Sequence, residues 1–237
     1  MLGKSEGIVL KTIRYSESSV ITRIFTREFG ELSFMVPGVR SAKNKSKGSL
    51  FQPLQFLELD IYYHPNKKLL KLKEFRPAYI YHSLYMDILK QSIALFTIEA
   101  LSKCIHEHEV NTDLYDYVRK FLLETDLNEK QDVLAPQRLL LQFSHILGFA
   151  PLFPKNPETD LYFNLEAGAF EPMPGIGGLS LDKNTSGLLL QLMSSAAPKF
   201  RSNERQLLTD TLVSYFRVHI PGFSQMASLE VLKQILH

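Results

Sequence analysis

The 237-residue sequence contains only one cysteine, Cys104, and no tryptophan. A single cysteine cannot form an internal disulfide, and it cannot supply the several cysteines that most structural zinc sites use. No run without a charged residue reaches the roughly 18 residues that a membrane-spanning helix requires. The first residues alternate like a strand and lack the apolar core of a signal peptide. We therefore expect a cytoplasmic protein without a disulfide, a bound metal or a membrane anchor.

Acidic residues are scarce in the first third of the chain. Residues 1–80 contain 14 Lys and Arg but only 7 Asp and Glu, whereas residues 81–237 contain 13 and 18. The overall net charge of +2 therefore divides into +7 and −5. The stretch from Arg40 to Lys47 has four cations and no acid. A charge asymmetry of this kind suggests a module that binds a polyanion, joined to a part with a different task.

Sequence motifs for catalysis are lacking as well. The glycine-rich stretch Gly175–Gly178 follows a proline instead of a strand, and no Gly-Lys-Ser/Thr comes after it, so we interpret it as a turn. His106 and His108 are two positions apart, which directs them to different sides of a helix, so we expect a solvated helix end and no metal site. We predict neither an active site nor a cofactor. A metal-dependent nuclease is the enzyme alternative, and Mg²⁺-dependent loss of substrate would reveal it.

The first third is predicted to form short strands. Leu57, Leu59 and Ile61 alternate with other residues in the period-2 pattern of a half-buried strand. Turn residues separate the strands, which we expect at 8–13, 19–26, 31–36, 56–63 and 69–75. Five short strands in about 75 residues fit a small closed barrel, because closure removes exposed strand edges. We predict an oligonucleotide-binding (OB) barrel over residues 1–78, since this is the commonest five-stranded case.

After Pro77 the apolar residues recur at helical spacing. Pro136 is expected in the first turn of one helix and Gly148 directly after its end. Residues 149–182 are irregular and contain a small predicted hairpin. The fold class is therefore α+β: a five-stranded OB-fold barrel, then an α-helical domain over residues 79–237 with a β-hairpin insertion. We expect helices near 84–105, 114–122, 139–147, 185–196, 203–219 and 228–236, and hairpin strands at 161–164 and 169–171.

Cations and aromatic residues are interleaved along the predicted barrel strands. OB surfaces combine a charged groove with aromatic side chains on which bases stack. The candidates for stacking are Tyr15, Phe34, Phe51 and Tyr62. A solvated loop whose lysines only maintain solubility is the alternative interpretation. The candidate nucleic-acid-binding residues are Lys11, Arg14, Arg23, Arg27, Arg40, Lys43, Lys45, Lys47 and Lys71.

Arg138 stands beside three leucines, Leu139–Leu141, on a predicted helix. A cation at the margin of an apolar helical surface can bind the carboxylate of a docked acidic peptide. An ordinary surface arginine would have the same neighbours in sequence. Arg138 and Leu141 are therefore candidates for a peptide site, with a plain helix surface as the alternative.

The order and spacing of motifs in the first 60 residues resemble the RecO family of bacterial recombination mediators. The chain reads Glu6-Gly-Ile-Val-Leu-Lys-Thr-x-x-Tyr15-x-Glu17-Ser18, then Phe25-Thr26-Arg27-Glu28-x-Gly30, then Gly38-Val-Arg40 and Gly48-x-Leu50-x-Gln52-Pro53. In the second part, the pattern Arg138-x₆-His145-x-Leu147-Gly148-Phe149 is similar to that family's helix ending in Leu-Gly-Tyr.

This resemblance implies an N-terminal OB domain, a helical C-terminal domain and no catalytic turnover. Proteins of the family bind single- and double-stranded DNA and anneal complementary strands. With the partner RecR they help the recombinase RecA to replace the single-stranded DNA-binding protein (SSB). Their helical domain holds the acidic SSB tail in an apolar pocket with a basic edge, and Arg138 and Leu141 stand on the matching helix. The resemblance thus implies a nucleoid-associated cytoplasmic protein with DNA on its barrel.

One departure from the family pattern concerns zinc. Many members carry a four-cysteine zinc module after the Leu-Gly helix, but residues 149–180 of this chain contain no cysteine. We expect the hairpin to fill that place without metal. Barrel sequence alone does not separate DNA from RNA, so an RNA- or ribosome-associated OB adaptor is the alternative function. Equal binding of RNA and DNA oligomers, without strand annealing, would favour the adaptor.

Overall fold

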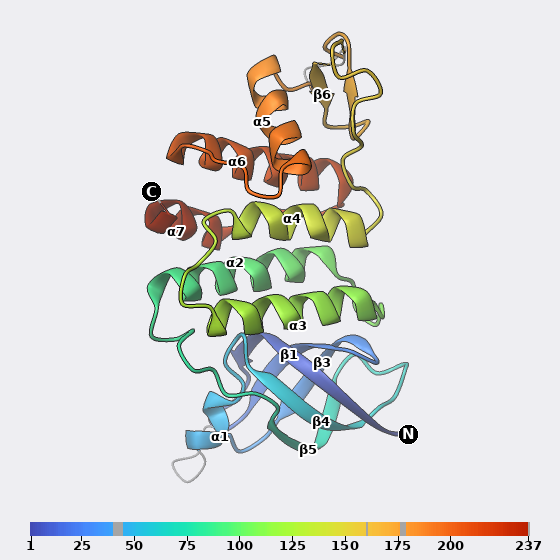
Figure 1. Cartoon of the computed structure of the whole chain (residues 1–237). Coiled ribbons are helices and arrows are strands. Elements are labelled where there is room, and N and C mark those ends of the chain that lie inside the picture. Colours follow the sequence, from blue (N-terminus) through green and yellow to red (C-terminus); the bar gives the residue numbers. More distant parts are fainter. Residues whose placement is uncertain (40–44, 160, 176–178, 237) are drawn as a thin grey trace. The chain divides into compact units, whose positions relative to one another are not determined.

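The structure is a computed structural model, and it describes residues 1–39, 45–159, 161–175 and 179–236 (Figure 1). These residues form two compact units, Met1–Gln131 and Asp132–His237. The first unit contains a β-barrel with two long helices, and the second contains helices and a hairpin. The sequence predicted a domain boundary after residue 78. In the structure this position lies inside the first unit, between the barrel and its two helices. That the barrel folds independently stays a prediction.

The barrel is formed by β1 (Leu2–Arg14), β2 (Val20–Thr26), β3 (Gly30–Val36), β4 (Phe56–Tyr62) and β5 (Leu70–Pro77). It closes in the order β1-β2-β3-β5-β4, which confirms the predicted OB-like barrel (Figure 1). Neighbouring strands are antiparallel except β3 and β5, whose short parallel pairing places Met35 beside Lys71. A five-residue helix, α1 (Lys45–Ser49), occupies a place where the sequence predicted only a loop.

The first strand begins at Leu2, well before residue 8, where the sequence predicted it. The additional residues include Gly3 and Gly7, and glycine has a low strand propensity. Both positions need the close approach that glycine allows. A Cβ atom would lie 2.6 Å from the Phe29 ring at Gly3 and 2.5 Å from the Ile24 side chain at Gly7. The added residues of β1 pair with β4, from Leu2 with Tyr62 to Ile8 with Phe56, so pairing with a distant strand decides where β1 begins.

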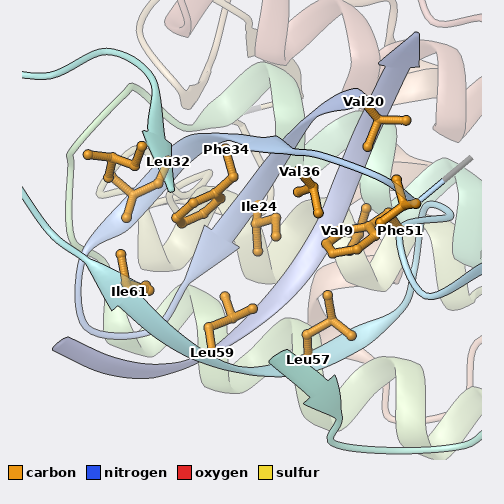
Figure 2. Close-up of a cluster of buried hydrophobic side chains, with 12 residues drawn as sticks. Val9, Val20, Ile24, Leu32, Phe34, Val36, Phe51, Leu57, Leu59 and Ile61 are labelled. Carbon is orange, nitrogen blue, oxygen red and sulfur yellow. The ribbon is translucent and has the colours of Figure 1, made fainter. Parts of the chain in front are cut away.

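The barrel core consists of apolar side chains that alternate inward along the strands (Figure 2). Leu57, Leu59 and Ile61 point inward, as their spacing predicted, and are at most 2 % exposed. Tyr62, the next residue along, lies outside and is 54 % exposed. Burying a large apolar side chain stabilises the fold by about 1.5–3 kcal/mol. The other core members are Val9, Val20, Ile24, Leu32, Phe34, Val36, Val39, Phe51 and Leu70.

Two further helices belong to the barrel unit, namely α2 (Ile88–Cys104) and α3 (Thr112–Leu127). Phe25 alternates with core residues on β2 and therefore faces outward, yet it is fully buried. Its ring packs against Tyr115 of α3, with 5.6 Å between the ring centroids. The Tyr115 hydroxyl donates a hydrogen bond to Glu6 of β1 at 3.0 Å, and Arg119 binds the same carboxylate. Helix α3 thus covers one part of the barrel's outer surface.

Asp126 near the end of α3 fixes the segment between β5 and α2. The residue is only 1 % exposed, and its carboxylate accepts four hydrogen bonds. The donors are the Tyr79 hydroxyl and the backbone N–H groups of His82, Ser83 and Leu84, at 2.8–2.9 Å. Burial raises the pKa of Asp126, but these hydrogen bonds outweigh burial and hold the pKa below its usual value. The buried carboxylate of Asp126 therefore joins α3 to the segment between β5 and α2.

The second unit contains α4 (Ala135–Ile146), β6 (Tyr162–Asn164), β7 (Ala169–Glu171), α5 (Lys183–Ser194), α6 (Ser202–His219) and α7 (Ala227–Leu236). Helix α4 packs on α6, where the Gln137 amide donates to the Arg205 carbonyl at 2.9 Å and to the Thr209 hydroxyl at 2.8 Å. Pro136 lies in the first turn of α4, as predicted. Gly148 follows the helix with a φ of +84°, which confirms its predicted role as the terminal glycine.

The predicted hairpin forms from β6 and β7. Phe163 faces Phe170 with 5.0 Å between the ring centroids, and Tyr215 of α6 packs against Phe163 at 5.6 Å. Apolar contacts between side chains thus hold this hairpin segment. Within the described residues, no three His, Cys, Asp or Glu side chains come close enough to hold a metal ion. Residues 176–178 of the predicted glycine-rich turn lie outside the described residues.

Candidate nucleic-acid interface

An exposed part of the barrel's outer surface, called the open face below, crosses β1, β2 and β3. Strand register places one polar row and one apolar row beside each other on it. The apolar row is accessible, since Ile13 is 51 % exposed and its neighbours are half-buried. OB folds bind oligonucleotides on the face of their second and third strands. The two rows are Lys11, Arg23 and Ser33, and Ile13, Ile21 and Met35.

Cations without an acidic partner flank the apolar row. Lys11 and Arg14 on β1 and Lys71 on β5 are exposed, and none of them has a carboxylate partner in the described part of the chain. Lys71 lies beside Met35 through the parallel pairing of β3 and β5. These three predicted binding residues therefore border the same open face from two sides.

Two of the four predicted stacking residues are available to a ligand. Tyr15 follows β1 and is 61 % exposed, and Tyr62 lies opposite Lys71 in register and is 54 % exposed. Phe34 and Phe51 are wrong as stacking candidates, because both rings are buried in the barrel core (Figure 2). Their burial contributes to stability and leaves the two tyrosines as the remaining stacking candidates.

Arg23, in the polar row, has a fixed partner. Its Nε donates a hydrogen bond to Glu31 Oε1, and the Glu31 side chain is 1 % exposed, whereas that of Arg23 is 40 % exposed. This hydrogen bond raises the pKa of the Arg23 guanidinium. Sequence reasoning did not identify Glu31, because the pair joins two strands diagonally.

Arg27, directly after β2, pairs with α3. Its guanidinium makes a bidentate pair with Asp116, at 2.7 and 2.8 Å, and it lies 3.4 Å from Glu28. The hydrogen bond from Arg27 lowers the pKa of Asp116. An arginine that is already paired with a carboxylate offers less charge to a phosphate. Its predicted role in binding DNA is therefore the least favoured of the described candidates.

The basic loop between β3 and α1 is only partly described. Arg40 and Lys43 lie outside the described residues, as does the side chain of Lys45. Lys47 is exposed and lines a groove of about 840 Å³ along β1, β4 and β5. Both charge signs line this groove, so it attracts a polyanion less than a purely basic surface would. Its other charged residues include Lys4, Lys73 and Arg76 together with Glu58, Asp60 and Glu74.

The histidine segment after α2 is not the solvated helix end that the sequence predicted. Helix α2 ends at Cys104, and the His108 N–H donates to the Glu31 carbonyl at 3.1 Å. A β-bridge between Glu31 and Glu107 accompanies this bond. Backbone pairing with β3 therefore positions this segment, and the two histidines are not part of a helix.

Arg138 lies on the surface of the second unit. Its Nη1 is 3.0 Å from Asp132 Oδ2, and its Nη2 donates to the Ala196 carbonyl at 2.9 Å. Leu139 is fully buried, so the half-buried Leu141 is the more accessible apolar neighbour. A small cavity of about 10 Å³ in this unit is lined by residues of α4, α6 and α7, but neither Arg138 nor Leu141 is among them.

The contact with Ala196 brings Arg138 close to a second basic segment. The loop between α5 and α6 continues from Ala196 to Lys199 and Arg201, both of which are exposed. Sequence reasoning missed these two cations, because they are about 60 positions away from Arg138 and no motif connects them.

Comparison with known proteins extends the resemblance to the whole chain. Residues 1–81, which span the barrel, match the family described as Recombination protein O N terminal. The chain is 33 % identical to the DNA repair protein RecO of Flavobacterium psychrophilum, over 98 % of both chains. The chain belongs to the RecO family of DNA repair and recombination proteins. RecO of Bacteroides fragilis is 32 % identical and RecO of Porphyromonas gingivalis 30 %, each over 99 % of both chains.

Membership of the RecO family confirms the resemblance that the motifs of the first 60 residues indicated. The matched region ends four residues after β5, so it coincides with the OB-like barrel. Among the described residues, no helix combines the length and the apolar character that crossing a membrane requires.

Proposed function

We propose that this member of the RecO family binds single- and double-stranded DNA on the open face of its barrel and anneals complementary strands. In this proposal it works without catalytic turnover, in the cytoplasm, as a mediator that helps to load a recombinase on SSB-coated DNA. The observation that carries the proposal is the open face itself. There Lys11, Arg14 and Lys71, which have no acidic partner among the described residues, border an accessible row of apolar side chains.

The open face has the two components that binding a single strand requires. Its lysines and arginine can neutralise phosphates, which gives affinity without sequence preference. The apolar row, with Tyr15 and Tyr62 nearby, can contact the faces of sugars and bases. A protein that screens the charge of two strands, and leaves the base edges free to pair, would favour annealing.

The helical unit supplies the proposed protein contacts. Arg138 and Leu141 on α4, with Lys199 and Arg201 on the neighbouring loop, offer several cations next to apolar surface. Such a combination suits a peptide with carboxylates and an aromatic end, as in the SSB tail. A RecR-like partner and, indirectly, RecA complete the proposed assembly by analogy with the family.

A salt titration tests the proposed DNA site. We expect the double variant Lys11→Ala/Lys71→Ala to bind a labelled single-stranded oligonucleotide more weakly than wild type. Its plot of log K against log salt should be shallower by about 1.4, because each phosphate contact on a single strand contributes about 0.7. The matched control is Lys155→Ala/Arg217→Ala, which removes two exposed cations from the second unit. An unchanged slope in the first variant would contradict the assignment.

An annealing assay tests the function itself. Complementary oligonucleotides coated with SSB should anneal faster with the protein present, and SSB without its tail should weaken this effect. Equal affinity for RNA and DNA without annealing would favour the adaptor function instead. Mg²⁺-dependent shortening of the oligonucleotides, abolished by EDTA, would indicate a nuclease.

A further inference from the structure

The contact between Arg23 and Glu31 has an unusual form for an arginine–carboxylate pair. The carboxylate uses one oxygen, Oε1, for the Nε of Arg23, and its other oxygen, Oε2, is buried without a hydrogen-bond partner in the described residues. A bidentate pair would occupy Nε and one terminal nitrogen of the guanidinium. Within the part of the chain that the structure describes, only the inner nitrogen of Arg23 is bound, so both terminal nitrogens are left for another ligand.

The surroundings of the pair make Glu31 a rigid support. Glu31 lies on β3 diagonally from Arg23 on β2, and its backbone carbonyl accepts the His108 N–H at 3.1 Å. Its side chain is 1 % exposed, whereas 40 % of the Arg23 side chain remains accessible. Arg23 therefore has a buried anchor at its inner nitrogen and an accessible outer end on the open face.

We propose that Glu31 is a positioning residue, which holds Arg23 by its Nε so that both terminal nitrogens face a phosphate of DNA bound on the open face. The inference rests on the proposed DNA site. An arginine has five N–H donors in a planar fork, and the terminal nitrogens supply four of them. Fixing the long side chain in advance removes part of the entropy cost of ordering it on binding.

A second effect of Glu31 opposes the first. Its negative charge attracts Arg23 and weakens the attraction of the same guanidinium for a phosphate, and Glu107 adds to this weakening. Two variants separate the positioning of Arg23 from the effect of the negative charge. Glu31→Gln removes the charge but keeps an oxygen that can accept from Nε, whereas Glu31→Ala removes both the charge and the acceptor.

The experiment measures the affinity of the full-length protein for a fluorescein-labelled single-stranded oligonucleotide at one fixed salt concentration. We expect Glu31→Gln to bind at least as tightly as wild type, and Glu31→Ala to bind about 2- to 10-fold more weakly, the range set by the lost ordering of one side chain. Thermal unfolding of both variants shows whether the barrel remains folded at the temperature of the titration.

A double-mutant comparison separates positioning from a general structural role. In an Arg23→Ala background, Glu31→Ala should no longer weaken DNA binding, because there is no guanidinium left to hold. In a Lys11→Ala background the loss should persist, although Lys11 lies directly opposite Arg23.

Three results would overturn the inference. The first is a Glu31→Ala variant that binds as tightly as wild type or more tightly, since Glu31 would then act only through its charge. The second is an equal loss of DNA affinity when Glu31→Ala is made in wild type and in the Arg23→Ala background, which would show that Glu31 has only a structural role. The third is an Arg23→Ala variant that binds the oligonucleotide as tightly as wild type, since Arg23 would then make no contact with DNA. If wild type itself does not bind the oligonucleotide, the proposed function fails, and that outcome differs from the other three.

Discussion

The two compact units differ less in charge than the two parts of the sequence do. The unit Met1–Gln131 contains 19 Lys and Arg and 16 Asp and Glu, a net charge of +3, whereas Asp132–His237 contains 8 and 9, a net charge of −1. Most of the excess acid after residue 80 lies in residues 81–131, which hold 5 basic and 9 acidic residues. The acidic helices α2 and α3 therefore belong to the same unit as the basic barrel.

This comparison shows how the barrel unit divides its cations. Arg27 and Arg23 are paired with Asp116 and Glu31, whereas Lys11 and Lys71 have no acidic partner in the described part of the chain. Arginine suits fixed pairs, because its planar fork matches a carboxylate, and lysine is a mobile point charge. Arg27 thus docks α3 on the barrel, and Glu31 holds Arg23 by one nitrogen, whereas the two lysines keep their whole charge for a ligand.

The largest expected effect comes from removing the Asp126 carboxylate, which joins α3 to the segment between β5 and α2 in the barrel unit. We expect Asp126→Ala to lower the free energy of unfolding by about 3–5 kcal/mol, because it leaves one buried and two partly buried N–H groups and the Tyr79 hydroxyl without an acceptor. Urea denaturation followed by circular dichroism measures the loss. Glu129→Ala, an exposed acid nearby, should stay within about 0.5 kcal/mol of wild type. A similarly small effect of Asp126→Ala would show that the network does not hold the unit together.

The same carboxylate gives a pH test of the barrel unit. The pKa of Asp126 is lowered in the folded protein, so its stabilisation is fully present above the unfolded value of about 4 and is lost as the pH falls through the folded value. The difference in unfolding free energy between wild type and Asp126→Asn should therefore shrink as the pH falls below about 4. A difference that stays constant down to pH 2 would contradict the hydrogen-bonding assignment.

The next largest effect concerns the contribution of the basic loop to DNA binding by the open face. We expect Lys43→Glu/Lys45→Glu/Lys47→Glu to weaken binding of single-stranded DNA while changing stability by about 0.5 kcal/mol or less. If the loop and its neighbours make about 4 phosphate contacts, the wild-type slope of log K against log salt is about −3, and the variant slope is shallower. Lys155→Glu/Arg217→Glu is the control from the second unit. Equal slopes in all three proteins would mean that the loop is only solvated.

A smaller effect is expected at the peptide site of the helical unit. Arg138→Ala should reduce the affinity for an acidic, Phe-ended peptide by about 1–3 kcal/mol, the range for a charge-assisted hydrogen bond. DNA affinity should hardly change, because the DNA site is proposed for the other unit. Fluorescence anisotropy with the peptide and with an oligonucleotide measures both. Arg217→Ala, another exposed arginine of this unit, is the control. A peptide that binds wild type and Arg138→Ala equally would place the site elsewhere.

The smallest expected effect sharpens the distinction between paired and unpaired cations in the barrel unit. We expect Arg27→Ala to leave the salt dependence of DNA binding unchanged, because Asp116 already occupies its guanidinium. Lys11→Ala, which removes a cation without an acidic partner, should make the slope shallower by about 0.7. A similar change for Arg27→Ala would show that DNA displaces Asp116.

Local patterns were sufficient for most of the secondary structure. The alternation of Leu57, Leu59 and Ile61 and the helical spacing after Pro77 depend only on near neighbours, so they can be read without the fold. The burial of Phe34, which contradicts its predicted stacking role, also follows from a local pattern. Phe34 alternates with polar residues and shares the inner face of β3 with Leu32 and Val36. The start of β1 was not predictable in this way, since it depends on pairing with β4, which lies far along the chain.

The sequence by itself determined the family, the barrel and the basic character of the first third, because motif spacing, side-chain periodicity and charge are properties of the chain. Only the tertiary structure decided which cations remain available. Arg27 and Asp116 are 89 positions apart, and Arg119 and Glu6 are 113 apart, so these pairs exist only once α3 has packed on the barrel. How much of a cation's charge a ligand can use depends on the carboxylates that folding brings to it, and distances in space determine that outcome.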